Sequence, residues 1–270
     1  MRTLHACAYV AFTALAVACG GGDSNKPDAL IVIPDAAIDA FQPDSPPDAQ
    51  VFDFSCMGNA APTTAPATVA ISGTASDINI IAMSLDPVEN AAVKAFREGN
   101  GGGPDVQIGT TTSDAGGVWS LPTVPTSLVP VEGYVEATKT GHRTLRLYPP
   151  SPIAADIPQA PLLLIADATF AQIVQFTGNS QNAANGTVGL AVVDCANTPI
   201  GGATISVKQN GVEQGTPQDL SQVQQGLFLV FDVPPGETVV SASYMGMDLR
   251  AHTLEVLAST TSTTAVKPGF

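Results

Sequence analysis

Histidine and cysteine are the residues of this chain best suited to bind a metal or act as a nucleophile. His142 and His252 are the two histidines outside the N-terminal segment, and neither lies in an H-x-H spacing or beside a C-x-x-C pair. Zinc sites use such closely spaced ligands. We therefore expect both histidines to be solvated residues of strands or loops, and the sequence predicts no metal site and no cofactor.

Known catalytic motifs are missing from the sequence. It contains no G-x-S-x-G elbow, no H-E-x-x-H pair and no phosphate-loop lysine. The glycine-rich stretch "GNGGGPD" at residues 99–105 lacks a following Lys-Ser or Lys-Thr, which indicates a flexible loop rather than a phosphate cradle. We predict that the protein is not an enzyme. An enzymatic alternative would need a pocket in which His, Asp or Arg side chains converge.

The balance of charge restricts the partners. The chain of 270 residues has 24 acidic and 10 basic residues, and its formal net charge is −14. Binding to nucleic acid needs clustered Lys and Arg to neutralise phosphates, so a nucleic-acid partner is excluded. The same balance argues against electrostatic attraction to an anionic membrane surface.

The N-terminus has the features of a targeting segment. The apolar run at residues 6–18 is too short to span a bilayer and fits the core of a signal peptide. It ends in "LAVAC", which resembles a bacterial lipobox and implies cleavage after residue 18 and lipidation of Cys19. The next residue is Gly20 rather than Asp, which by the sorting habit of such lipoproteins implies the bacterial outer membrane, on either face. The alternative is an ordinary secretory signal that leaves Cys19 free.

An acidic, proline-rich segment follows at residues 19–55. "KPDA", "IPDA", "QPDS" and "PPDA" recur along it, so prolines favour extended backbone while the aspartates repel one another. We predict a disordered tether that spaces the chain from the membrane. In the alternative, these aspartates bind calcium, but such loops need converging carboxylates and the spacing here is irregular.

Short runs of alternating apolar and polar residues begin at residue 68 and again near residue 186. Three motifs occur twice in the same order: "NAAVKAF" with "GGATISV", "GVWSLPTVP" with "GLFLVFDVP", and "VEATKTG" with "VSASYMG". Period-two alternation between turn residues indicates β-strands, and an ordered repeat indicates duplicated modules. Trp119 falls on Phe228 in this alignment, which favours a buried core position for the tryptophan.

These ordered motifs resemble the carboxypeptidase regulatory-like domain of the transthyretin-like β-sandwiches. The resemblance implies an all-β fold with two tandem Greek-key sandwiches. The expected domains are the signal peptide at 1–18, the tether at 19–55, module one at 56–152, a linker with a short helix at 153–185, and module two at 186–270. In the linker, Asp167 is expected to cap the helix, Phe170, Ile173 and Val174 to share one face, and Gly178 to end it.

Cys56 and Cys195 remain after the N-terminal segment and Cys19 are set aside. Export to an oxidising compartment favours pairing, so we predict a disulfide that pins the end of the tether to the first strand of module two. The alternative is two separate thiols, with Cys195 buried and Cys56 exposed.

Aromatic side chains are the remaining candidates for ligand contact. We expect Tyr134 and Tyr244 to be exposed and able to contact a ligand. The sequence favours a non-enzymatic, lipid-anchored envelope protein whose modules serve adhesion, scaffolding or protein contacts. The alternative is a carbohydrate-binding surface lipoprotein, which would need an exposed strip of aromatic rings on one sheet.

Overall fold

Alternating apolar and polar residues build the described structure almost entirely from β-strands. The computed structural model describes residues 51–79, 84–99, 103–222 and 224–270. In strand β5 (Val118–Pro125) the side chains of Trp119, Leu121 and Val124 are buried, while Val118 and Ser120 between them are exposed. This is the alternation that one buried sheet face requires. The predicted all-β sandwich class is confirmed.

The first copy of the repeat, called copy one, contains strands β1 to β8. In one sheet, β1 pairs with β2, β5 and, in parallel, β8. In the facing layer, β3 lies between β4 and β6, and β6 pairs with β7. The other strands are β1 (Thr68–Asn79), β2 (Ser84–Pro87), β3 (Ala92–Arg97), β4 (Val106–Thr112), β6 (Gly133–Thr138), β7 (Thr144–Tyr148) and β8 (Ile157–Leu164).

The second copy, called copy two, contains strands β9 to β17. Here β9 pairs with β13 and, in parallel, β17, while β14 lies between β10 and β16. The strands are β9 (Gly186–Val192), β10 (Thr204–Gln209), β11 (Val212–Glu213), β12 (Pro217–Asp219), β13 (Leu227–Val233), β14 (Gly236–Tyr244), β15 (Met247–Asp248), β16 (His252–Val256) and β17 (Thr260–Val266).

The two copies repeat one pattern of strand pairing. The pairs β1–β5, β1–β8, β3–β6 and β6–β7 of copy one correspond to β9–β13, β9–β17, β10–β14 and β14–β16 of copy two. Gly117 and Gly226 precede equivalent strands with φ of 75° and 73°. A Cβ atom would lie 2.4 Å from the Ala75 carbonyl oxygen at Gly117 and 2.7 Å from that of Val192 at Gly226. The same close turn is therefore built twice.

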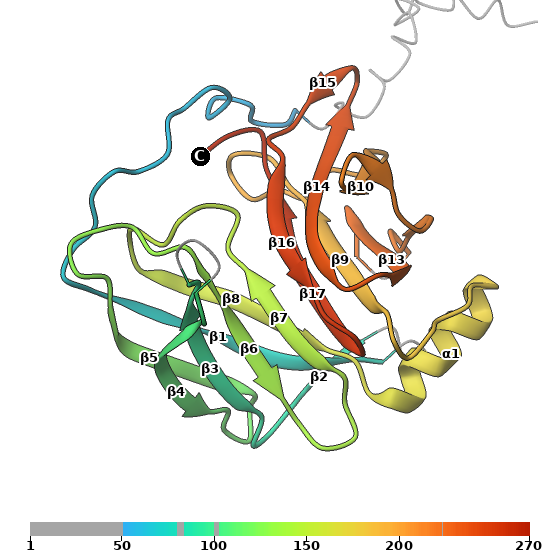
Figure 1. Ribbon diagram of the computed structural model, residues 1–270, viewed down its shortest axis with the longest axis horizontal. Helices are drawn as coiled ribbons and strands as arrows, with labels where there is room; N and C mark the ends of the chain where they lie inside the picture. Colours follow the sequence, from blue (N-terminus) through green and yellow to red (C-terminus); the bar gives the residue numbers. More distant parts are fainter. Residues whose placement is uncertain (1–50, 80–83, 100–102, 223) are drawn as a thin grey trace, which may run out of the picture. The chain divides into compact units, whose positions relative to one another are not determined.

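One strand joins the two copies into a continuous sheet. Strand β17 pairs in parallel with β9 of its own copy and with β7 of copy one. The resulting sheet has eight strands in the order β12-β13-β9-β17-β7-β6-β3-β4 (Figure 1). Thr261, Ser262 and Thr264 of β17 are buried in the middle of it. Copy one and copy two therefore share main-chain hydrogen bonds as well as side-chain contacts.

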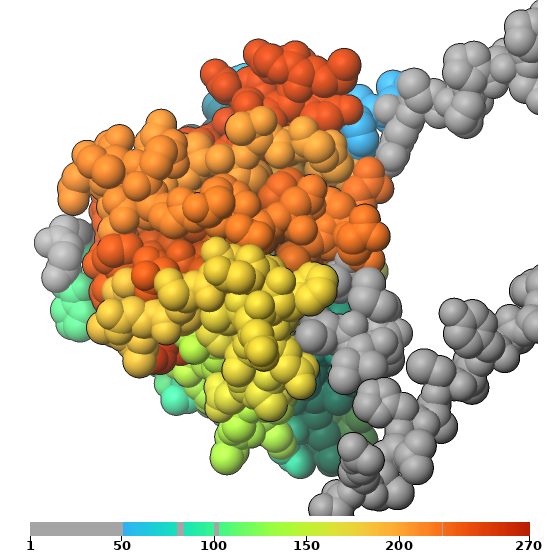
Figure 2. All heavy atoms as spheres, turned by 90° about the vertical axis from the view of Figure 1, so that its right-hand side faces the viewer, coloured from blue at the N-terminus to red at the C-terminus, as the bar shows by residue number. Residues whose placement is uncertain are grey.

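A single helix in the described residues covers the junction of the copies. Helix α1 (Asp167–Thr177) buries Phe170 and Ile173, and its end at Gly178 is left-handed, with φ of 68°. Figure 2 shows this segment, in yellow, between copy two and copy one. The predicted cap was wrong: Asp167 lies in the first turn, and Ala166 is the N-cap residue without a side-chain cap. The carboxylate of Asp77 instead accepts the Ala166 N–H at 3.0 Å.

Candidate functional site

The two cysteines of the predicted pair form a disulfide. Cys56 and Cys195 are joined with Cα atoms 5.7 Å apart and lie 139 residues apart in the sequence. The bond links the chain just before copy one to the end of the first strand of copy two. The predicted disulfide is therefore confirmed, and the alternative of two separate thiols is wrong.

Residues 51–59, here called the strap, lie against copy two around this disulfide. The Asp53 carbonyl accepts the Cys195 N–H at 2.8 Å, and the Asp53 N–H donates to the Asp194 carboxylate at 2.9 Å. Met57 forms an antiparallel bridge with Gly269 near the C-terminus. The strap is thus hydrogen-bonded to both ends of copy two.

Tyr244, one of the two candidate ligand-contact aromatics, lies under the strap. Its ring centroid is 5.4 Å from that of Phe52 in an edge-on arrangement and 6.3 Å from that of Phe54 in a stacked one. Tyr244 is half-buried in this cluster. Two aromatic rings of the strap therefore already pack against Tyr244. Ligand contact by Tyr244 stays a prediction.

The expected exposure of Tyr134 was wrong. Only 3% of this residue is accessible. Its ring lies 5.1 Å from the Phe96 ring and 5.2 Å from the Tyr148 ring, with the Arg146 guanidinium 4.3 Å from its centroid. The hydroxyl donates to the Asp105 carboxylate at 2.8 Å. Burial and this hydrogen bond raise the pKa of Tyr134. Side chains from strands β3 and β7 cover the ring.

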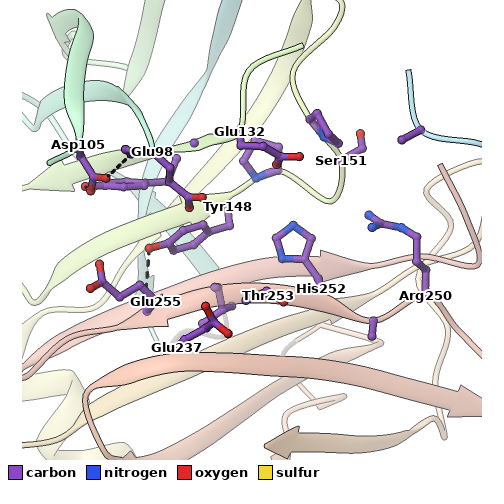
Figure 3. Close-up of a pocket in the computed structure, with 18 of the residues that line it drawn as sticks. Glu98, Asp105, Glu132, Tyr148, Ser151, Glu237, Arg250, His252, Thr253 and Glu255 are labelled. Atoms are coloured by element: carbon purple, nitrogen blue, oxygen red, sulfur yellow. Dashed lines mark hydrogen bonds between the residues drawn. The ribbon is translucent and has the colours of Figure 1, made fainter. Parts of the chain in front are cut away.

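A pocket of about 620 Å³ opens beside these tyrosines. Tyr134 is part of its lining. Glu132, Tyr148 and Ser151 of copy one lie on one side of the pocket, and strand β16 with Arg250 lies on the other (Figure 3). The Tyr148 hydroxyl donates to the Glu255 carbonyl at 3.4 Å. Carboxylates come from both copies: Glu98, Asp105, Glu132, Glu237 and Glu255.

The electrostatics of the pocket are shaped by partial burial. Burial raises the pKa of Glu98, and the carboxylates of Glu132 and Asp105 raise it further. Burial also lowers the pKa of His252, with a further lowering by Arg250. His252 was expected to be solvated, but it is partly buried in the pocket wall. This lining offers many hydrogen-bond acceptors and few cations, which suits a polar ligand that can donate hydrogen bonds.

The remaining predicted residues lie elsewhere. Trp119 is 1% accessible in the core of copy one, which confirms the core interpretation. His142 lies near helix α1, with its Nε2 atom 3.7 Å from the Asp77 carboxylate. The described residues contain no group of three or more His, Cys, Asp or Glu side chains placed to hold a metal ion.

The N-terminal predictions fall on residues that the structure does not describe. Cys19, its lipidation, the signal peptide and most of the tether precede residue 51. In the described part of the chain, no helix has both the length and the apolar character needed to cross a membrane. The lipid anchor and the outer-membrane location stay predictions.

No pattern in the sequence predicted the pocket. Its walls include residues 98–99, 103, 105, 132–134, 148–149, 151–152 and 250–255, which are far apart in the chain. The pairing of β17 with β7 brings these segments together. No local spacing in the sequence signals that pairing.

Comparison with known proteins finds similar solved structures but no matching family. No protein-family model matches the chain, and no curated protein matches it. Among solved structures, it is similar to the Bacillus anthracis TIE protein, with 16% identity over 74% of this chain and a TM-score of 0.25. The chain spans 34% of that protein.

Two pilins are also similar. The shaft pilin SpaA from Lactobacillus rhamnosus GG has 8% identity and a TM-score of 0.25, with coverage of 75% of this chain and 98% of the pilin. A streptococcal ancillary pilin has 11% identity and a TM-score of 0.22, with coverage of 74% and 62%. At these TM-scores the likeness carries no argument about function.

Proposed function

We propose that the chain is a non-enzymatic protein of the cell envelope, held at the bacterial outer membrane by a lipid on Cys19. Its two modules, each of the carboxypeptidase regulatory-like type, serve adhesion, scaffolding or protein contacts. The observation that carries this proposal is the eight-stranded sheet shared by both copies. A shared sheet fixes the modules to each other, because a hinge between them would break the hydrogen bonds of β17 with β7.

Rigid coupling is useful to a protein that holds a partner at a set place. A flexible linker lets two modules move independently, whereas paired strands remove that freedom. The disulfide adds a covalent connection between the strap and copy two. Both features support a role in presentation or scaffolding.

Fractionation of cells tests the anchored location. Wild-type protein should be labelled by radioactive palmitate and should sediment with outer membranes in a sucrose gradient. The Cys19→Ala variant should lose the label and leave that fraction. Equal labelling of the two proteins would refute the lipid anchor. Photo-crosslinkers placed on exposed strand residues, such as Val118 and Val239, would then identify contacting envelope proteins.

A carbohydrate-binding role is the second candidate, and the pocket favours it. Five carboxylates and the Ser151 hydroxyl offer acceptors for sugar hydroxyls beside two tyrosine rings. Against it, Trp119, Tyr134 and Tyr148 are buried, so they form no exposed aromatic strip. A glycan array with wild type, the Glu98→Gln/Glu132→Gln variant and a Glu213→Gln control tests it. The pocket variant should lose a signal that the control keeps; equal binding by all three proteins would reject the pocket.

A further inference from the structure

The chain reaches copy two before it builds copy one. The described structure begins at residue 51, and the strap lies against copy two through the Phe52, Phe54 and Tyr244 rings. Only at Thr68 does the chain begin β1 of copy one. In Figure 1 the strap, in blue, begins beside β15 and β14. The order of contacts therefore differs from the order of the copies in the sequence.

The C-terminal end lies at the same place. Gly269 bridges Met57, and a Cβ atom on Gly269 would lie 1.9 Å from the Cys56 carbonyl oxygen. Only glycine allows this approach of two backbone segments. Both ends of the described chain are thus held on copy two, next to the Cys56–Cys195 bond.

Copy one lies inside the covalent loop that this bond closes. Strands β1 to β8 all lie between Cys56 and Cys195, which are 139 residues apart in the sequence. A force along the backbone that arrives at Cys56 has a covalent path through the two sulfur atoms to Cys195. The backbone of copy one is a longer path in parallel with it and stays slack.

We propose that the strap and its disulfide form a tension bypass. Force that enters from the N-terminal side passes into copy two, and the backbone of copy one carries none of it when the other attachment is on copy two or at the C-terminus. This deepens the proposed function, since an anchored envelope protein is pulled by whatever it holds. Copy one stays folded under that force, and copy two yields first.

Optical tweezers test the bypass on residues 20–270, the mature chain without Cys19, with handles at its two ends. Complete unfolding should lengthen wild type by about 500 Å less than the Cys56→Ser/Cys195→Ser variant, since 139 residues stay inside the loop at ~3.6 Å each. Equal lengthening of the two proteins would overturn the proposal. Unchanged Trp119 fluorescence at zero force is the control that the variant is folded.

A buried reporter thiol tests whether copy one itself is spared. Val93 is fully buried in copy one, so Val93→Cys places a thiol that reacts with a maleimide only when copy one opens. Under a pulling force that unfolds copy two, this thiol should stay unreacted with the disulfide intact and react in the serine background. Equal reaction in both backgrounds would overturn the bypass. Neither experiment involves the lipid or a partner, so a failed palmitate test and a failed bypass are distinguishable.

Discussion

Replacing Trp119 with alanine should lower the free energy of unfolding by about 3–5 kcal/mol. The residue is 1% accessible, and its ring packs in the core of copy one. A buried tryptophan removes about 150–250 Å² from water, which at ~25 cal/mol per Å² corresponds to about 4–6 kcal/mol. The methyl group of alanine keeps a small part of that burial, so the lower range applies.

Replacing Trp119 with phenylalanine should cost far less. Copy two has Phe228 at the matching position, also buried, at 4% accessible. Among the described residues, the buried Trp119 Nε1 atom has no hydrogen-bond partner, and phenylalanine removes that atom. Relief of an unpaired donor gains about 1–3 kcal/mol, whereas the smaller ring leaves a cavity that costs about 1 kcal/mol. We expect the two effects to cancel or to leave the variant more stable by up to about 2 kcal/mol.

Urea denaturation followed by far-ultraviolet circular dichroism measures both variants, because the fluorescence signal is lost with the tryptophan. A cost below about 1 kcal/mol for Trp119→Ala would refute the core assignment. A phenylalanine variant as unstable as the alanine variant would refute the correspondence of the two copies at this position. Val118→Ala, one residue away on the exposed face of β5, is the matched control and should change little.

Three further outcomes are expected. The Cys56→Ser/Cys195→Ser variant should be about 5 kcal/mol less stable to urea, because a 139-residue loop is no longer closed in the unfolded chain; a loss under ~1 kcal/mol would contradict this. Burial raises the pKa of Tyr148 to about 12 from 10.0, so the unfolded phenol ionises first. The stability lost as the pH rises from 10 to 12 should be about 2–3 kcal/mol larger in wild type than in Tyr148→Phe, because Tyr134, whose pKa is also raised, contributes equally to both proteins; equal losses would contradict the assignment. Gly117→Ala should destabilise by more than its control Gly141→Ala, since both have positive φ but only Gly117 meets a carbonyl at 2.4 Å; equal melting temperatures would count against the close turn.

The repeat made most strands predictable from the sequence. The runs of alternating residues lay between turn residues, and the three motifs that occur twice in the same order placed equivalent strands in both copies. Strand β8 was missed within the predicted linker, because its segment "IPQAPLLL" contains Pro158 and Pro161. Proline cannot donate to a ladder and argues against a strand. Here the strand pairs in parallel with β1 alone, at the side of the sheet away from β5.

The candidate site was less predictable for a physical reason. Exposure of Tyr134 depends on Phe96, Arg146 and Tyr148, which reach it only after the strands pair. The cysteine pair was predictable without knowledge of the fold, because two cysteines remain after the N-terminal segment and Cys19 are set aside and export to an oxidising compartment favours their pairing. The pocket, in contrast, forms only when the pairing of β17 with β7 brings remote segments together, and no sequence motif predicts that pairing.

The loop closed by the Cys56–Cys195 disulfide affects what proteolysis can release. A single cut anywhere in copy one, between Cys56 and Cys195, leaves the two pieces of chain joined through sulfur. The exposed turn around Leu128 and Val129 is the kind of site where proteases cut. Such nicked molecules would keep both ends of the chain and would differ from intact ones only on a gel run with reductant. Release of a fragment needs a second cut or reduction of the disulfide.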